Sequence, residues 1–341
     1  MWRGVLGLSP PAWRRRFGQG RSPFGPTFAP RTPDLARASL NGRVLSREPF
    51  LRPMPNCDCH APEILAVADD LRRGAQSDWE YAQAVYNFTT SSVVHSIERA
   101  PRGVVDTLRR GYGLCGDKVF LFIALARAGG LPARCCRLRI EVSPEAGGDE
   151  APWARILGRL SEYLKTKSDP AHRNFAAAWT QLTDLIRDAI DTRLAQSARE
   201  GRPLVWERSD GTHPVAEVNV GGVWIPADPS TDDAECAFYG LPLQRLGYLP
   251  GALRIIRGSI SGRSEETSFG WRQDVWRAVI CSVARGAIDC LNESIEDARR
   301  RGRQIIEEMG AANYIRSHRR FYVPVEGLDA IGIQLPPYPS A

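Results

Sequence analysis

The sequence contains a long apolar segment that follows a cysteine: Gly111-Tyr-Gly-Leu-Cys115-Gly-Asp-Lys-Val-Phe-Leu-Phe-Ile-Ala-Leu-Ala-Arg-Ala-Gly-Gly130. From Val119 to Leu125 every residue is apolar, which predicts a helix that is buried all round. The two glycines and Pro132 end it. Cys115 lies at the start of this helix, where the positive end of the helix dipole favours the thiolate. The segment therefore predicts a reactive cysteine at the head of a central helix.

A second stretch, His213-Pro-Val-Ala-Glu-Val-Asn-Val-Gly-Gly-Val-Trp-Ile-Pro-Ala-Asp228, predicts a hairpin, because a Gly-Gly loop joins two alternating runs. In that register Val220 faces Val223 and Val215 faces Asp228. His213 and Asp228 then become diagonal neighbours on one face, about 7 Å apart between backbones. The other face is entirely apolar and predicts a core surface, with Ala216, Val218, Val220, Val223, Ile225 and Ala227.

These residues supply the parts of a covalent catalyst. A cysteine attacks acyl groups when a histidine takes its proton and a carboxylate orients that histidine. We therefore predict Cys115 as the nucleophile, His213 as the base and Asp228 as the orienting acid.

The two stretches resemble the transglutaminase-like superfamily, the branch of the papain-like cysteine fold that includes transglutaminases, peptide N-glycanases and many bacterial proteases. The resemblance covers roughly residues 49–136 and 210–250 and implies the same three catalytic residues. It rests on the following motifs: Gly113-x-Cys115-Gly-Asp, Arg127-Ala-Gly-Gly-Leu-Pro-Ala-Arg134, His213-x-x-x-Glu217-Val, Asp228-Pro-Ser, Ala82-Gln-Ala-Val-Tyr-Asn-Phe88 and Val104-Val-Asp-Thr-Leu108.

The chain departs from the family pattern at two places. Pro214-Val215 stands where an aromatic residue usually follows the histidine. His95 stands where a tyrosine often ends the helical segments that precede the nucleophile. Both departures concern substrate contacts or the surroundings of the oxyanion, and they leave the three catalytic residues in place.

The resemblance implies an α+β fold, with a papain/transglutaminase-like core in which the nucleophile begins a central helix packed on an antiparallel sheet. It implies hydrolysis of amides or peptides, or acyl transfer to an amine, with a peptide, protein or acyl-thioester substrate. An amide synthase that uses a carrier-bound thioester is an alternative, and so is a non-catalytic binding or scaffold member. No cofactor is expected, and the sequence contains no Asp-x-Asp-x-Asp-Gly calcium loop.

Other site residues follow from the geometry of the acyl reaction. The backbone N–H of Cys115 is the natural oxyanion donor at the helix start, and Tyr112 is a candidate for the second donor. Trp224 and Glu217 lie on the His213 face and are candidates for substrate contacts. Glu217 also fits a solvated strand residue with no role in binding.

The amino-acid composition argues against two classes of binding partner. The 341 residues carry a net charge of +6, but only three of the 45 basic residues are lysines. An arginine excess of this kind is typical of a GC-rich genome, and no arginine stripe alternates with aromatic residues, so nucleic-acid binding is not expected. No apolar run reaches the length of a membrane span, so no membrane partner is expected.

The eight cysteines lack the spacing of a disulfide framework, which favours reduced thiols and a cytoplasmic location. Cys57-Asp-Cys59-His60 invites a zinc interpretation, but no second ligand pair follows at metal spacing. Cys135-Cys136 are neighbours in a predicted strand, and packing is the simpler interpretation for both.

The organisation of the chain is predicted from pattern. Residues 1–48 are rich in Arg, Pro and Gly and fit a disordered segment, a transit peptide or a misassigned start. Residues 49–341 form one transglutaminase-like domain. It contains a helical insertion at about 143–210 and a C-terminal helical region at about 269–309. Both ends of the insertion lie near the catalytic edge, so its helices are predicted to cover the cleft.

The remaining elements are predicted from periodicity and caps. Helices are expected at Pro62–Leu71 and at Asp78–Phe88, the second capped by Ser77 or Asp78. The insertion is expected to hold helices at 153–165 and 175–199. Residues 238–251 are expected to be irregular, and short strands are expected at Tyr322–Val325 and Ile331–Gln334.

Overall fold

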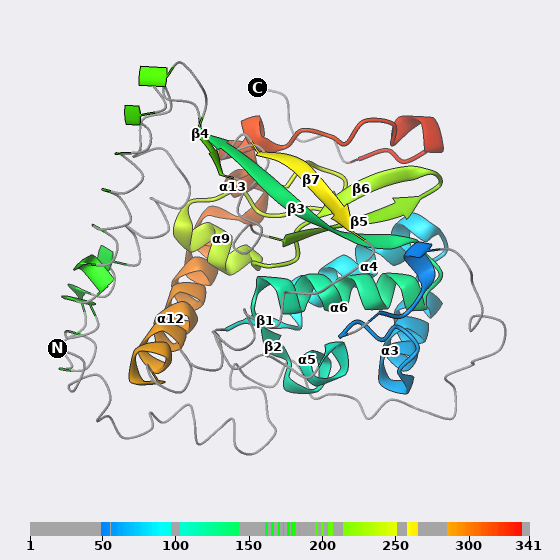
Figure 1. Cartoon of the computed structure of the whole chain (residues 1–341), viewed down its shortest axis with the longest axis horizontal. Helices are drawn as coiled ribbons and strands as arrows, with labels where there is room; N and C mark the ends of the chain where they lie inside the picture. Colours follow the sequence, from blue (N-terminus) through cyan, green and yellow to red (C-terminus); the bar gives the residue numbers. More distant parts are fainter. Residues whose placement is uncertain are drawn as a thin grey trace.

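A computed structural model describes residues 49–54, 56–96, 103–142, 204–206, 214–250, 258–264 and 285–335, together with single positions between 161 and 200. Helices and a small sheet both contribute to the described part (Figure 1). The segment 1–48 lies outside the described residues, so its predicted character stays a prediction.

The central helix is α6, Cys115–Ala128, and it begins at the predicted nucleophile. Three helices pack on it, α3 (Pro62–Arg73), α4 (Asp78–Ser91) and α5 (Val104–Arg110), and strand β5 covers another side (Figure 1). Every residue of α6 from 116 to 128 is buried, which confirms the prediction of a helix enclosed all round.

The sheet that lies over α6 is antiparallel and has the order β4-β3-β5-β6, with β7 also paired to β3. Its strands are β3 (Ala133–Val142), β4 (Leu204–Trp206), β5 (Pro214–Val220), β6 (Val223–Ala227) and β7 (Gly258–Ser264). Because β3 directly follows α6, the helix and the centre of the sheet are tied together by a short turn.

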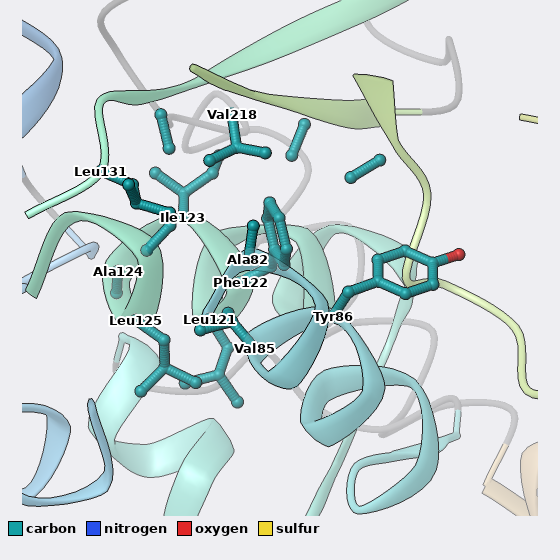
Figure 2. Packing of buried hydrophobic residues seen from close by; sticks show 14 of the residues in the cluster. Ala82, Val85, Tyr86, Leu121, Phe122, Ile123, Ala124, Leu125, Leu131 and Val218 are labelled. Carbon is teal, nitrogen blue, oxygen red and sulfur yellow. The ribbon is translucent and has the colours of Figure 1, made fainter. Parts of the chain in front are cut away.

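The hairpin of β5 and β6 has the predicted register, with Val220 opposite Val223 and Ala216 opposite Ala227. The predicted core face is confirmed, since all of its residues pack in the main cluster of apolar side chains. Figure 2 shows Val218 of β5 above the α6 residues Phe122 and Ile123. A slip of one residue would have turned this face toward solvent.

The elements that precede α6 also agree with the sequence patterns. Helix α4 starts after Ser77, whose side chain accepts a hydrogen bond from the backbone N–H of Glu80, as an N-cap should. Strands β1 (Val94–His95) and β2 (Tyr112–Gly113) pair in parallel, and β2 leads directly into α6. The end of β1 is thereby placed beside the start of the central helix.

A second apolar cluster forms between α9 (Asp233–Tyr239), α12 (Arg285–Met309) and α13 (Ala311–Ser317). Helix α9 corrects the expectation that residues 238–251 are irregular from their start. Its N-cap Asp232 and Glu235 form a capping box, a pattern that is visible in the sequence.

In the C-terminal part, the prediction of a long helix is confirmed in part, and the other predicted elements are not found. Of the predicted helical region, 285–309 is helical and 269–284 lies outside the described residues. The two predicted closing strands are wrong. Around Pro324 there is only an isolated bridge to Tyr248, and Asp329–Ile331 is a short 3-10 helix.

The predicted insertion is described at single positions only. Those between 176 and 200 are helical, whereas its last part, Leu204–Trp206, is strand β4. The two helices predicted within the insertion, at 153–165 and 175–199, end before these three residues. Ala176 is buried in the cluster of α9, α12 and α13, so this part of the insertion packs there. Its role as a cover over the cleft stays a prediction.

Among the described helices, none combines the length and the apolar character needed to cross a bilayer.

Gly302 of α12 lies directly against α9. A Cβ atom there would lie 1.7 Å from the carbonyl oxygen of Ala234. Gly302→Ala should therefore cost about 3 kcal/mol of overpacking, offset by about 1 kcal/mol of helix propensity. We expect a net loss of about 2 kcal/mol in the free energy of unfolding, measured in urea.

Gly74→Ala is the matched control for Gly302→Ala. At Gly74 the nearest atom to an added Cβ, the Leu71 carbonyl oxygen, is 3.7 Å away, and φ is −83°. Its unfolding free energy should stay within about 0.5 kcal/mol of wild type. Equal free energies of unfolding for the two variants would show that α12 does not pack tightly against α9 at Gly302.

Candidate active site

Cys115 is the first residue of α6 and its side chain is partly exposed. The turn before it is fixed by Asp117, whose Oδ2 accepts a hydrogen bond of 2.8 Å from the backbone N–H of Leu114. Gly113 is required for this turn, because a Cβ there would lie 2.7 Å from the Cβ of Asp117. Asp117 thus shapes the turn and also places a negative charge at the positive end of the helix dipole.

The other cysteines in the described part of the chain are buried. Burial raises the pKa of the Cys57 thiol to about 12 and that of Cys59 to about 11. It also raises the pKa values of Cys136 and Cys236, so these thiols stay protonated at neutral pH. Cys115 is therefore the only thiol among the described residues that reagents can reach readily.

Cys57 and Cys59 do not form a metal site with His60. The Cys57 thiol donates to the Phe120 carbonyl oxygen at 3.5 Å, and the Cys59 thiol points to the Leu51 carbonyl oxygen at 3.6 Å. Within the ranges that the structure covers, no group of three His, Cys, Asp or Glu side chains could hold a metal ion.

Asp228 follows the end of β6 and is buried, with 4% of its surface exposed. Its Oδ1 accepts hydrogen bonds from the backbone N–H of Ser230, at 3.1 Å, and from the Ser230 hydroxyl. Its backbone oxygen accepts a bond of 3.1 Å from the Tyr86 hydroxyl. The Asp228-Pro-Ser motif therefore holds the carboxylate by its own turn and ties it to α4.

The predicted base, His213, lies outside the described residues, and the described part of β5 starts at Pro214. The observed register of β5 and β6, continued by one pair, places Val215 opposite Asp228. The approach of His213 to Asp228 therefore remains a prediction from that register.

The two candidates for substrate contacts, Glu217 and Trp224, both contact Arg134. Glu217 is buried, not solvated, and its Oε2 accepts a bond of 2.6 Å from Arg134. The Arg134 guanidinium lies 3.8 Å above the Trp224 ring, and Phe50 meets that ring edge-on at 5.3 Å. Trp224 is also four residues, or about 13 Å along the strand, from Asp228. Substrate contact by either residue stays a prediction.

The oxyanion candidates lie on either side of Leu114. As the first residue of a helix, Cys115 has a backbone N–H with no partner inside the helix. Tyr112 is partly buried in β2, opposite Val94, and the Arg110 guanidinium lies 6.0 Å from its ring centre. Its role as a second donor stays a prediction.

Sequence reasoning missed a second histidine–carboxylate pair. The Nδ1 of His95 is 3.0 Å from Oε1 of Glu235, which is 1% exposed. His95 pairs with Gly113, two residues before Cys115, so this pair borders the start of α6. The capping box at Asp232 could have located Glu235 at a helix start, but no local signal links it to His95.

Lys118, in the first turn of α6, was also missed as a site residue. Its side chain is fully buried, and its Nζ donates to the Thr90 carbonyl oxygen at 3.3 Å. A lysine is rarely buried to this extent.

One comparison with known proteins gives a match. The family model described as "Transglutaminase-like superfamily" matches residues 65–229, a segment that contains Cys115, His213 and Asp228. Searches of the curated proteins and of the solved structures found no significant match. This match makes the segment from residue 65 to residue 229 similar to the transglutaminase-like superfamily.

Proposed function

We propose that this protein is an enzyme that forms an acyl-enzyme on Cys115 and passes the acyl group to water or to an amine. The observation that carries the proposal is the position of Cys115, a partly exposed thiol at the start of a buried helix. The superfamily generally uses cysteine-based acyl chemistry, which supports the same conclusion.

We infer that the core has the papain-like arrangement, with His213 between Cys115 and Asp228. His213 takes the proton of the Cys115 thiol, and the thiolate attacks the carbonyl carbon of an amide, ester or thioester. The backbone N–H of Cys115 stabilises the developing oxyanion. The imidazolium then protonates the leaving group, the carbon–leaving-group bond breaks, and the acyl thioester remains on Cys115.

The second half-reaction decides between hydrolysis and transfer. Water or an amine attacks the acyl thioester while His213 accepts its proton, the carbon–sulfur bond breaks, and the thiolate is restored. The same three residues serve both outcomes, so the choice depends on how well the site excludes water. Peptides, proteins and acyl thioesters are the proposed substrates, and amide synthesis from a carrier-bound thioester fits the same scheme.

Alkylation kinetics test this proposal without a known substrate. The folded protein is treated with limiting iodoacetamide at pH 7, and the modified cysteines are identified by peptide mass spectrometry. We expect Cys115 to react at least tenfold faster than every other cysteine, since a thiolate is the reactive form. In Cys115→Ala the fast phase should be absent.

A non-catalytic member of the fold would behave differently. If Cys115 in the folded protein reacts no faster than the same cysteine in urea, its environment does not activate it. The acyl-enzyme proposal would then be withdrawn in favour of a binding or scaffold role.

A further inference from the structure

The segment in front of Cys115 contains two glycines in four residues, Gly111 and Gly113. Gly111 has a φ of 67°, a left-handed conformation that favours glycine. Glycines give the backbone more freedom than other residues do, so the position of Cys115 depends on bonds that hold this segment from outside. Asp117 supplies one bond, to the N–H of Leu114, but from within α6 itself. Strand β1 supplies two more.

Strand β1 binds both glycines through its backbone. The N–H of Val94 donates to the Gly111 carbonyl oxygen at 2.9 Å, and the N–H of Ser96 donates to the Gly113 carbonyl oxygen at 3.1 Å. In the described part of the chain, β1 and β2 form a two-stranded sheet of their own, with two residues in each strand. A sheet of this size is marginally stable at best without further contacts. The side chains of β1 must therefore anchor it to the rest of the protein.

The polar side chains at the end of β1 contact two helices that lie far away in the sequence. The Nδ1 of His95 is 3.0 Å from Oε1 of Glu235 in α9, and because a carboxylate only accepts, Nδ1 is the donor. The next residue, Ser96, is fully buried, and its Oγ donates to Oδ1 of Asn292 in α12 at 3.2 Å. Both bonds connect the segment before Cys115 to the C-terminal part of the chain.

Glu235 is a well-fixed partner for His95. Its side chain is 1% exposed, and its backbone N–H donates to Oδ1 of Asp232 at 2.8 Å in the capping box of α9. Asp232 in turn forms an ion pair with Arg299 of α12, and both of these side chains are buried. Burial and these bonds restrict the conformations of the Glu235 side chain. His95 is therefore bonded to a carboxylate whose position is set by two helices.

We propose that His95 is a positioning residue of the active site: its hydrogen bond to Glu235 fixes β1, and through β1 the glycine-containing segment that places Cys115. The proposal rests on the acyl-enzyme function above. It goes beyond that function because α9 and α12 lie outside residues 65–229, the segment that matches the family model. The nucleophile of this chain is thereby held in place by helices that follow the matched segment.

The test compares His95→Ala and His95→Asn with wild type in the rate of Cys115 acetylation by p-nitrophenyl acetate at pH 7. His95→Ala removes the bond to Glu235 and should lower this rate about tenfold, because a displaced nucleophile reacts more slowly. His95→Asn keeps an N–H donor at the place of Nδ1 and lacks Nε2, so it should recover most of the rate. An Asn variant as slow as the Ala variant would overturn the positioning role, since the bond to Glu235 would then not be what matters.

Hydrogen exchange measured by NMR reports the positioning itself. In wild type the N–H groups of Val94 and Ser96 are bonded to the two glycines. We expect both amides to exchange at least tenfold faster in His95→Ala and at nearly the wild-type rate in His95→Asn, while the amides at the centre of α6 stay unchanged. Slower acetylation without faster exchange at these two amides would contradict the proposal. Faster exchange with an unchanged acetylation rate would contradict it as well, while the acyl-enzyme function stands.

His318→Ala is the matched control. His318 is also a partly buried histidine that contacts α9, since its Nε2 lies 3.3 Å from the carbonyl oxygen of Gly240, the C-cap of that helix. This contact is at the end of α9 opposite to its N-cap, so its loss should lower the urea midpoint but leave acetylation of Cys115 at the wild-type rate. An equal loss of acetylation in His318→Ala would show a general structural effect and overturn the proposal. If Cys115 is not acetylated even in wild type, the acyl-enzyme function fails, and the positioning role fails with it.

Discussion

Cys115→Ala and His213→Ala should each reduce turnover of an activated ester and of a glutaminyl peptide to background. Both residues are needed for the same step, so losing either one removes it. Asp228→Asn should remain folded and slow the reaction about 10²- to 10⁴-fold, because the carboxylate only orients the base and stabilises its charged form. Initial rates under saturating substrate give these ratios.

Two controls make the result specific. Far-UV circular dichroism and urea midpoints should show that all three variants are folded. Cys115→Ser should be nearly as inactive as Cys115→Ala, since a hydroxyl is a far poorer nucleophile than a thiolate at neutral pH. Activity in Cys115→Ser close to that of wild type would contradict thiolate attack.

Phe122→Ala should have the largest effect on stability, about 3–5 kcal/mol in the free energy of unfolding. Phe122 is fully buried at the centre of α6 and meets the Tyr86 ring edge-on at 6.2 Å (Figure 2). Because the Tyr86 hydroxyl donates to the backbone of Asp228, the cavity would also loosen the support of Asp228. Urea unfolding followed by fluorescence measures the loss.

Phe321→Ala is the matched control. Phe321 lies in a short 3-10 helix, is only partly buried and belongs to neither apolar cluster. Its truncation should cost about 1 kcal/mol or less. If both truncations cost the same, the region around Phe122 is not the core that supports the site.

The parts of the fold that the sequence predicts correctly are those with strong local patterns. The apolar run after Cys115 can only be a buried helix, and the Gly-Gly loop fixes the register of β5 and β6 to the residue. Ser77 marks the start of α4 in the same way. In each case a few neighbouring residues are enough to predict the element.

The parts that could not be predicted depend on contacts between distant segments. His95 and Glu235 are 140 residues apart in sequence, and no local pattern in either segment predicts their pairing. The burial of Lys118 depends on α4, whose Thr90 carbonyl oxygen accepts a hydrogen bond from its Nζ, although the position of Lys118 in α6 was clear from the sequence. The predicted strand at Tyr322–Val325 is wrong for a related reason, since among the described residues this segment forms one isolated bridge, between Pro324 and Tyr248.

Trapping the acyl-enzyme tests covalent acyl chemistry on Cys115 directly. The protein is mixed with p-nitrophenyl acetate at pH 7, quenched in acid within seconds, and analysed as intact mass and as peptides. We expect a rapid release of p-nitrophenolate that matches one acetyl group per protein, located on the peptide that contains Cys115. Cys115→Ala should show neither. Acetylation that is absent from Cys115 in wild type, or unchanged in Cys115→Ala, would contradict covalent acyl chemistry on this cysteine.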